Sequence, residues 1–330
     1  MKRFILTLFC FAFLGAFVCA EIQFPHSLNL VTDMAYYPYS DWKVGEPDTH
    51  FAPITGAYSA LEARATLNYT YTIKCPFADN PFVRGNTLKF TGSLEVSPVT
   101  LMPMFQVQFT PIAFLVFSAG TKVGTGWTVP GLAQGIAQYN DITDEYDDMT
   151  PFKDWYLSAW FEGLFQFDVG ALWPGDWHHI VTQASYRITY NRNTGVDNGD
   201  VWLWQTVKEY ANGPMYLGTL LLGYQMPLVL QTVALQAEFE GYFNADTFAQ
   251  RYAAWNPKFQ KINISPVAIL KFNDHHQLTA QFRFRSRRSY LAGVKYQDNG
   301  KVNSADVMDL LYSSREWYFD RLAFSYKYTF

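Results

Sequence analysis

The last ten residues of this 330-residue chain alternate between large apolar side chains and small or polar ones. The large apolar residues stand at every second position: Leu322, Phe324, Tyr326, Tyr328 and Phe330. Successive side chains of a β-strand point to opposite faces, so this spacing predicts a strand with one apolar face and one polar face. The strand is expected to continue to the last residue of the chain.

This final segment resembles the C-terminal insertion signal of bacterial outer-membrane β-barrel proteins. The resemblance rests on the alternation, on the aromatic Tyr328 two positions before the end, and on the terminal Phe330. It implies a location in the outer membrane, with membrane lipid and the barrel assembly machinery as partners. It points to no particular family and to no solute.

The same alternation recurs in nine further segments of the chain. Together with the last one they cover residues 56–74, 87–98, 104–119, 155–171, 178–190, 214–226, 229–243, 258–272, 277–291 and 315–330. A strand with one apolar and one polar face suits a barrel whose outside meets lipid and whose inside meets water. We therefore predict an all-β fold, an antiparallel transmembrane β-barrel over residues 56–330, with about ten strands and a range of eight to twelve.

The connections between the expected strands alternate between long and short. The long ones are 75–86, 120–154, 191–213, 244–257 and 292–314, and the short ones are 99–103, 172–177, 227–228 and 273–276. Bacterial barrels have short turns at the periplasmic rim and long loops outside, so we expect the long connections to face the exterior. The strand-like segment 201–207 would break this alternation as a spanning strand, and we assign it to an extracellular arm.

The first 55 residues precede the regular pattern. A basic start at Lys2 and Arg3, an apolar stretch and a small residue at Ala20 predict a cleaved signal peptide over residues 1–20. Residues 21–55 contain several prolines and a broken alternation, which fits a periplasmic lead-in, an inserted plug or extra strands.

Composition excludes several classes of protein. Loss of Lys2 and Arg3 with the signal peptide leaves 23 basic against 29 acidic residues, a net charge of −6, which makes nucleic acid an unsuitable partner. Cys75 would be the one remaining cysteine, so no internal disulfide can form. A soluble β-sandwich is the main alternative fold, but the terminal strand, the alternating connections and the long strands favour the barrel.

The polar strand faces are expected to line the lumen, and they carry more basic than acidic residues. The acidic ones are Glu62, Glu95, Glu162, Asp168, Glu238 and Glu240. The basic ones are Arg64, Lys74, Lys89, Arg187, Lys261, Lys271, Arg283, Arg285, Arg287, Arg315, Arg321 and Lys327. This excess predicts a basic lumen that attracts anions.

Arg283, Arg285 and Arg287 form the densest cluster, on one face of one expected strand. Glu238 and Glu240 share a face two strands earlier, and Lys261, on the strand between, is expected at a similar height. Arg321 is a further residue expected to line the pore. In one interpretation these groups pair with each other and help to fill a narrow barrel. In the other, the arginines line an open path for anions.

Barrel enzymes need particular residue constellations. Phospholipase and lipid A deacylase barrels place a His two residues before a Ser, and the chain has no such pair. Asp176-Trp177-His178 and Asp274-His275-His276 resemble the Asp-x-His pair of omptin proteases, and Asp147-Asp148 resembles their second pair. The two kinds of pair are expected at opposite rims. We therefore predict no enzymatic activity, no cofactor and no metal site.

Two functions fit these expectations. The first is a narrow, anion-preferring diffusion channel, similar to a porin, that passes small anionic solutes. The alternative is a surface-exposed structural or adhesin-type barrel that binds an extracellular ligand through its long loops.

Overall fold

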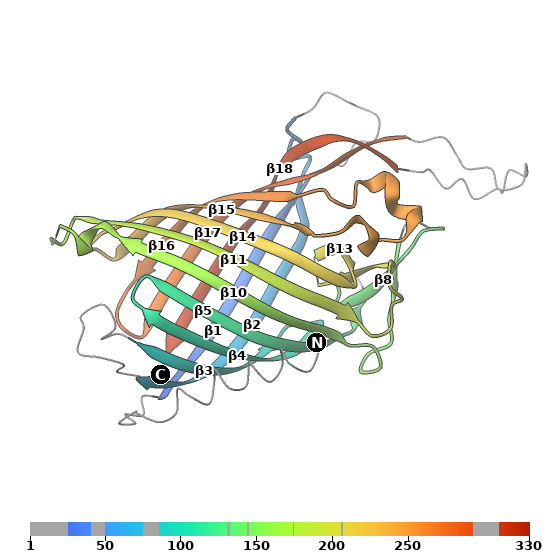
Figure 1. Ribbon diagram of the computed structural model, residues 1–330. Helices are drawn as coiled ribbons and strands as arrows, with labels where there is room; N and C mark the ends of the chain where they lie inside the picture. The colour runs from blue at the N-terminus through green and yellow to red at the C-terminus, as the bar shows by residue number, and fades with distance from the viewer. Residues whose placement is uncertain are drawn as a thin grey trace, which may run out of the picture.

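The computed structural model describes residues 26–40, 50–74, 86–130, 133–143, 145–173, 175–205, 207–292 and 310–330. Twelve antiparallel strands close into a single barrel (Figure 1). They are β1 (His26–Tyr39), β2 (Gly56–Lys74), β3 (Thr87–Val96), β4 (Thr100–Ile112), β5 (Leu115–Gly126), β10 (Tyr156–Asp168), β11 (His179–Asn193), β14 (Gly213–Gln225), β15 (Leu230–Tyr242), β16 (Lys261–Lys271), β17 (His276–Ala292) and β18 (Leu310–Thr329).

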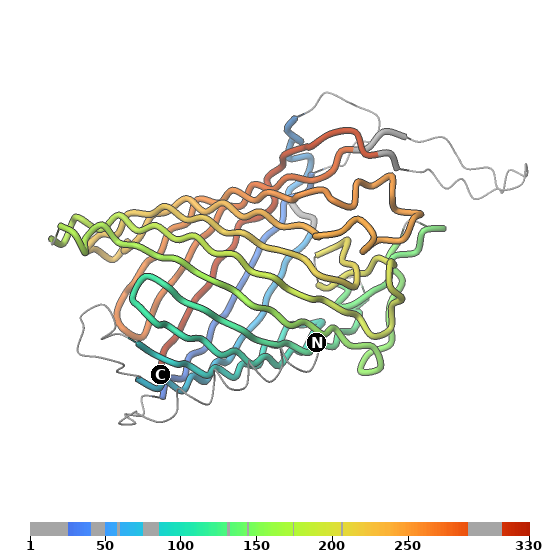
Figure 2. Tube along the Cα trace, in the orientation of Figure 1, coloured from blue at the N-terminus to red at the C-terminus, as the bar shows by residue number. Residues whose placement is uncertain are grey.

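The barrel is closed by the pairing of its first and last strands. β1 and β18 run side by side, with Asn29 opposite Thr329 and Tyr36 opposite Leu322 (Figure 2). The end of the barrel where β1 begins and β18 ends is called here the terminal rim, and the opposite end the loop rim. The predicted terminal strand is therefore a wall of the barrel, and the soluble sandwich is excluded.

The strand count exceeds the expected ten for two reasons. β1 lies within residues 21–55, for which a lead-in, a plug and extra strands were the alternatives, so the barrel starts at His26 and not at residue 56. The predicted strand over 104–119 is in fact β4 and β5, joined by a turn at Ala113-Phe114. The register shifts by one residue between Phe109 and Ile112, beside that turn.

This split also moves one predicted loop. With β4 and β5 counted separately, β2 ends and β3 begins at the terminal rim, opposite to the rim expected for the connection 75–86. Residues 75–85 themselves lie outside the described residues. The connection from Val96 to Thr100 belongs to the loop rim although it is short. The later long connections, from β5 onward, join strands at the loop rim as predicted.

The outer face of the barrel is apolar. Leu67, Phe105, Leu222 and Phe282 are each 44 to 59% exposed although they are large and hydrophobic. Beside Phe105 and Phe282, the neighbouring Gln106, Gln281 and Arg283 turn polar side chains into the barrel. No helix among the described residues is long and apolar enough to cross a membrane. Because an apolar outer face is unfavourable in water, this surface is expected to contact lipid.

The terminal residue Phe330 is integrated into the terminal rim. Its backbone N–H donates to the Leu28 carbonyl at 3.0 Å, and its ring packs edge-on against Tyr328. We expect Phe330→Ser to lower the folded, heat-modifiable fraction in the outer membrane while leaving secretion across the inner membrane unchanged. Semi-native gel electrophoresis of membrane fractions measures this, with Thr329→Ser as the control on the other face of the strand. A normal folded yield of Phe330→Ser would contradict the insertion-signal prediction.

Candidate functional site in the barrel lumen

Two connections at the loop rim fold back into one small sheet. β8 (Ile136–Asn140) and β9 (Glu145–Asp148) come from the connection between β5 and β10, and β12 (Val201–Trp204) and β13 (Val207–Ala211) from the connection between β11 and β14. They pair in the order β13-β12-β8-β9 and gather at the loop rim (Figure 1). We call this four-stranded unit the loop sheet. The segment 201–207 thus belongs to an arm, as predicted, and that arm packs against the barrel wall.

The loop sheet has its own apolar core against the inner wall. Trp202 is fully buried, and its ring lies 4.9 Å from that of Tyr210 and 5.3 Å from that of Tyr156 on β10. Ile136 from β8 and Met102 from β4 belong to the same cluster. Apolar burial of this kind is the main stabilising term for a folded unit. The loop sheet is therefore a fixed part of the folded barrel.

Two glycines make room for this packing. A Cβ atom on Gly124 of β5 would overlap the ring of Trp204. A Cβ atom on Gly135, just before β8, would overlap the carbonyl oxygen of Val99. The wall and the loop sheet approach so closely at these points that only glycine fits.

The β12–β13 hairpin also carries polar groups that hold it to the wall. At its tip, Gln205 donates hydrogen bonds to Thr100 at 2.8 Å and to Glu95 at 3.3 Å. Further along, Glu209 accepts from Arg288 at 2.5 Å and forms an ion pair with Lys261 at 3.0 Å. Burial opposes ionisation of Glu209, but the charges of Lys261 and Arg288 lower its pKa from 4.5 to about 2.

The predicted arginine cluster is paired with carboxylates. Arg285 contacts Glu240 at 2.5 Å, and both side chains are less than a quarter exposed. Arg283 lies 3.5 Å from Glu238, and Arg287 donates to Glu316 at 2.7 Å. Lys261, expected near Glu240, is its register partner but forms its ion pair with Glu209. The geometry thus agrees with the interpretation in which these groups pair with each other.

A bulge in β18 explains why further carboxylates face inward. Arg283 pairs with Arg321 and Phe284 with Phe319, so Asp320 is an extra residue. On the loop-rim side of this bulge, Glu316 is the register partner of Arg287. Asp320 itself forms an ion pair with Arg321 at 2.9 Å. The alternation thus changes face along this strand.

The expected charge balance of the lumen needs correction. Four inner carboxylates were not counted from the sequence: Asp33 of β1, Glu209 of the loop sheet, and Glu316 and Asp320 of β18. Arg315, counted as inward, lies on the opposite strand face and donates to Ser286 at 2.6 Å. At the level of the loop sheet, most of the positive charge is therefore neutralised.

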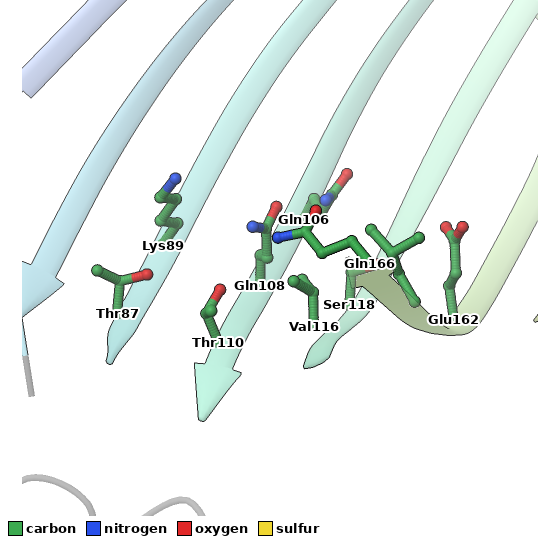
Figure 3. Close-up of a pocket in the computed structure, with 10 residues that line it drawn as sticks. Thr87, Lys89, Gln106, Gln108, Thr110, Val116, Ser118, Glu162 and Gln166 are labelled. Atoms are coloured by element: carbon green, nitrogen blue, oxygen red, sulfur yellow. The ribbon is translucent and has the colours of Figure 1, made fainter. Parts of the chain in front are cut away.

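Two polar cavities remain inside the barrel. One, of about 380 Å³, lies between the hairpin tip at Gln205 and Val207 and the wall at Glu62, Arg64 and Arg321. The other, of about 450 Å³, lies against β3, β4, β5 and β10 nearer the terminal rim (Figure 3). The predicted residues Arg283 and Arg321 border the first cavity, and Glu240 and Lys261 lie beside the base of the hairpin.

The protease-like pairs lie far from one another. Asp176-Trp177-His178 lies in a turn at the terminal rim, and Asp274-His275-His276 lies in another and reaches the first residue of β17. Asp147 and Asp148 belong to β9 at the loop rim. Asp148 accepts from Thr128, and Asp147 accepts from Asn140. The omptin-like arrangement is thus not formed. Within the described part of the chain no cluster of His, Cys, Asp and Glu could hold a metal ion.

Comparisons with known proteins find distant structural neighbours and no family. No protein-family model and no curated protein sequence matches the chain. Similar solved structures include OprB of Pseudomonas putida (5% identity, 93% of this chain and 94% of that one, TM-score 0.38), the β domain of the Bordetella autotransporter BrkA (10%, 92% and 98%, TM-score 0.41) and the channel DcaP of Acinetobacter baumannii (8%, 93% and 97%, TM-score 0.34). These are outer-membrane β-barrel proteins. Likenesses at this level carry no information on solute or partner.

Proposed function

We propose that this protein is an outer-membrane diffusion channel for small polar solutes, and that the loop sheet narrows its outer mouth. The observation that carries the proposal is the cavity of about 380 Å³ between the hairpin tip and the charged wall. A solute crossing the barrel would pass between Gln205 on one side and Arg64 and Arg321 on the other. Polar and charged walls around a narrow space are typical of membrane pores.

The proposed location follows from the two faces of the wall. The outer face is apolar and suits lipid, and the inner face is polar and suits water. In this arrangement the terminal rim faces the periplasm, the loop rim faces the exterior, and the barrel assembly machinery inserts the chain through β18. The signal peptide over residues 1–20 is part of the same proposal and lies outside the described residues.

The anion preference stays a prediction, but the arginine cluster can no longer be its main source. The arginines near the loop sheet are paired, so they contribute little net charge to a passing ion. Any preference must then come from basic groups elsewhere in the lumen. We expect a weak preference, measurable as a reversal potential in a salt gradient and decreasing at high salt as charges are screened.

The alternative function, a surface-exposed adhesin-type barrel, relied on long loops that project outward. The connections between β5 and β10 and between β11 and β14 instead form the loop sheet and bury Trp202. Ile136, Trp202 and Trp204 are thus engaged with the barrel itself, while Ile142 and Phe152 of the same connections stay exposed. This favours the channel over the adhesin, because a binding surface needs accessible side chains.

Conductance in planar lipid bilayers tests the proposal. We expect small discrete steps from the wild-type protein, and steps several times larger when residues 200–211 are replaced by a short Gly-Ser linker. Exchange of the β8–β9 turn, residues 141–144, serves as the control, because its Ile142 is 66% exposed. The linker variant removes no barrel strand, so it should still fold, as judged by heat-modifiable mobility. Absence of steps from both well-folded proteins would refute the channel.

A further inference from the structure

One row of side chains crosses five neighbouring strands in the cavity nearer the terminal rim. Lys89 is the register partner of Gln108, Gln108 of Ser118, Ser118 of Glu162, and Glu162 of Arg187. Directly opposed residues in an antiparallel sheet lie about 5 Å apart, so the row is continuous. Figure 3 shows Lys89 and Glu162 at opposite ends of the cavity with the glutamines between them.

The charges in this row do not cancel. Glu162 accepts two hydrogen bonds from Arg187, at 2.5 and 2.9 Å, so that pair is neutral as a unit. Lys89 lines the same cavity and has no carboxylate partner within the described part of the chain. The cavity therefore has one unneutralised positive charge, at one end. An ammonium group in this position attracts a carboxylate or another small anion.

The middle of the cavity offers many neutral hydrogen-bonding groups. Gln106, Gln108, Thr110 and Ser118 line it, together with Gln166. Amides and hydroxyls donate and accept, which matches the hydroxyl groups of a polyol. Val116 and Leu164 lie among them and provide apolar contact for a carbon chain. A mostly polar lining with a small apolar patch therefore suits a solute that has several hydroxyl groups on a short carbon chain.

We propose that this cavity binds a small hydroxylated carboxylate, with the carboxylate at Lys89 and the hydroxyl groups along the glutamines. The proposal rests on the channel function and deepens it, because it names the solute class that the channel would favour. It also moves the source of anion preference from the arginine cluster, where charges are paired, to Lys89. The cavity lies toward the terminal rim, so the loop sheet does not have to move for the site to fill.

Gluconate and sorbitol are matched probes, because they have the same chain length and differ in the carboxylate. Isothermal titration of folded protein in detergent should show gluconate binding and much weaker sorbitol binding. Lys89→Gln should weaken gluconate binding about fivefold, the upper range for a partly solvated ion pair. Lys74→Gln removes the same charge from an exposed position at the end of β2, outside the cavity lining, and should leave binding unchanged.

The outcomes separate this site from the channel function. Equal binding of gluconate and sorbitol, or equal effects of Lys89→Gln and Lys74→Gln, would overturn the site. Gluconate binding without any conductance would support the site and overturn the channel. Liposome swelling gives the same comparison for transport: sorbitol entry without a gluconate advantage at low salt would leave the channel intact and reject the solute class.

Discussion

Arg285→Gln should lower the free energy of unfolding by about 3 kcal/mol, because it leaves the carboxylate of Glu240 buried without its main partner. The two groups are 2.5 Å apart, and their side chains are 13% and 23% exposed. Removal of one partner from such a pair costs about 3 to 5 kcal/mol in general. Lys261, the register partner of Glu240, can supply part of the lost charge, so we expect the lower end of this range.

Urea unfolding of the refolded protein in detergent measures the effect of Arg285→Gln. Arg251→Gln is a matched control, since Arg251 pairs with Asp141 and Asp200 but is 47% exposed. We expect that control to change stability by less than about 1 kcal/mol. The double variant with Glu240→Gln should recover most of the loss, because no unpaired charge remains. Equal stability of Arg285→Gln and Arg251→Gln would mean that the arginine faces an open, solvated path.

Alternation along the strands made most of the barrel predictable from sequence. In β18 the large apolar residues from Leu322 to Phe330 all fall on one face, so both the element and its lipid-facing side follow directly from the spacing. β1 was harder to predict from the sequence, because its inner face contains the apolar Val31 and Ala35 while its outer face contains the polar Thr32. With the hydrophobic pattern mixed in this way, only pairing with β2 and β18 determines the strand.

The turn between β4 and β5 gave only a weak local signal, Pro111, which a bulge within one long strand would also explain. It contains no Gly, Asn or Asp, the residues that usually mark a tight hairpin. Apolar residues at Phe109, Ile112 and Leu115 continue across it, so the two strands resemble a single long one. Each added strand reverses the direction of the chain, so this one missed turn placed both earlier connections, between β2 and β3 and between β3 and β4, at the wrong rim.

The inner charges could not be derived from alternation alone. Asp320 becomes an inward residue only because of the bulge in β18, and bulges leave little trace in a single sequence. The contact between Gln205 and Glu95 joins residues 110 positions apart. A signal for the loop sheet did exist in the four consecutive apolar residues Val201 to Trp204, since a strand buried on both faces has no alternation.

Glu209→Gln should release the β12–β13 hairpin and raise the conductance at neutral pH, with Glu145→Gln in the exposed β9 strand as the control. Glu209 neutralises Lys261 and Arg288, which are 20% and 5% exposed, so its loss leaves two buried cations beside Arg285 and Glu240. The pKa of Glu209 is lowered from 4.5 to about 2, which corresponds to a stabilisation of about 3 kcal/mol.

The same shift predicts how acid acts on the wild-type channel. A carboxylate with a lowered pKa stabilises the attached hairpin fully above pH 4.5, and this stabilisation is lost as the pH falls through about 2. Single-channel conductance should therefore be equal at pH 7 and pH 5 and rise between about pH 4 and pH 2 in the wild type. Glu145→Gln should retain that rise. In Glu209→Gln the large conductance steps should already be present at pH 7. If the conductance of this variant at pH 7 equals that of the wild type, other contacts hold the hairpin in the lumen.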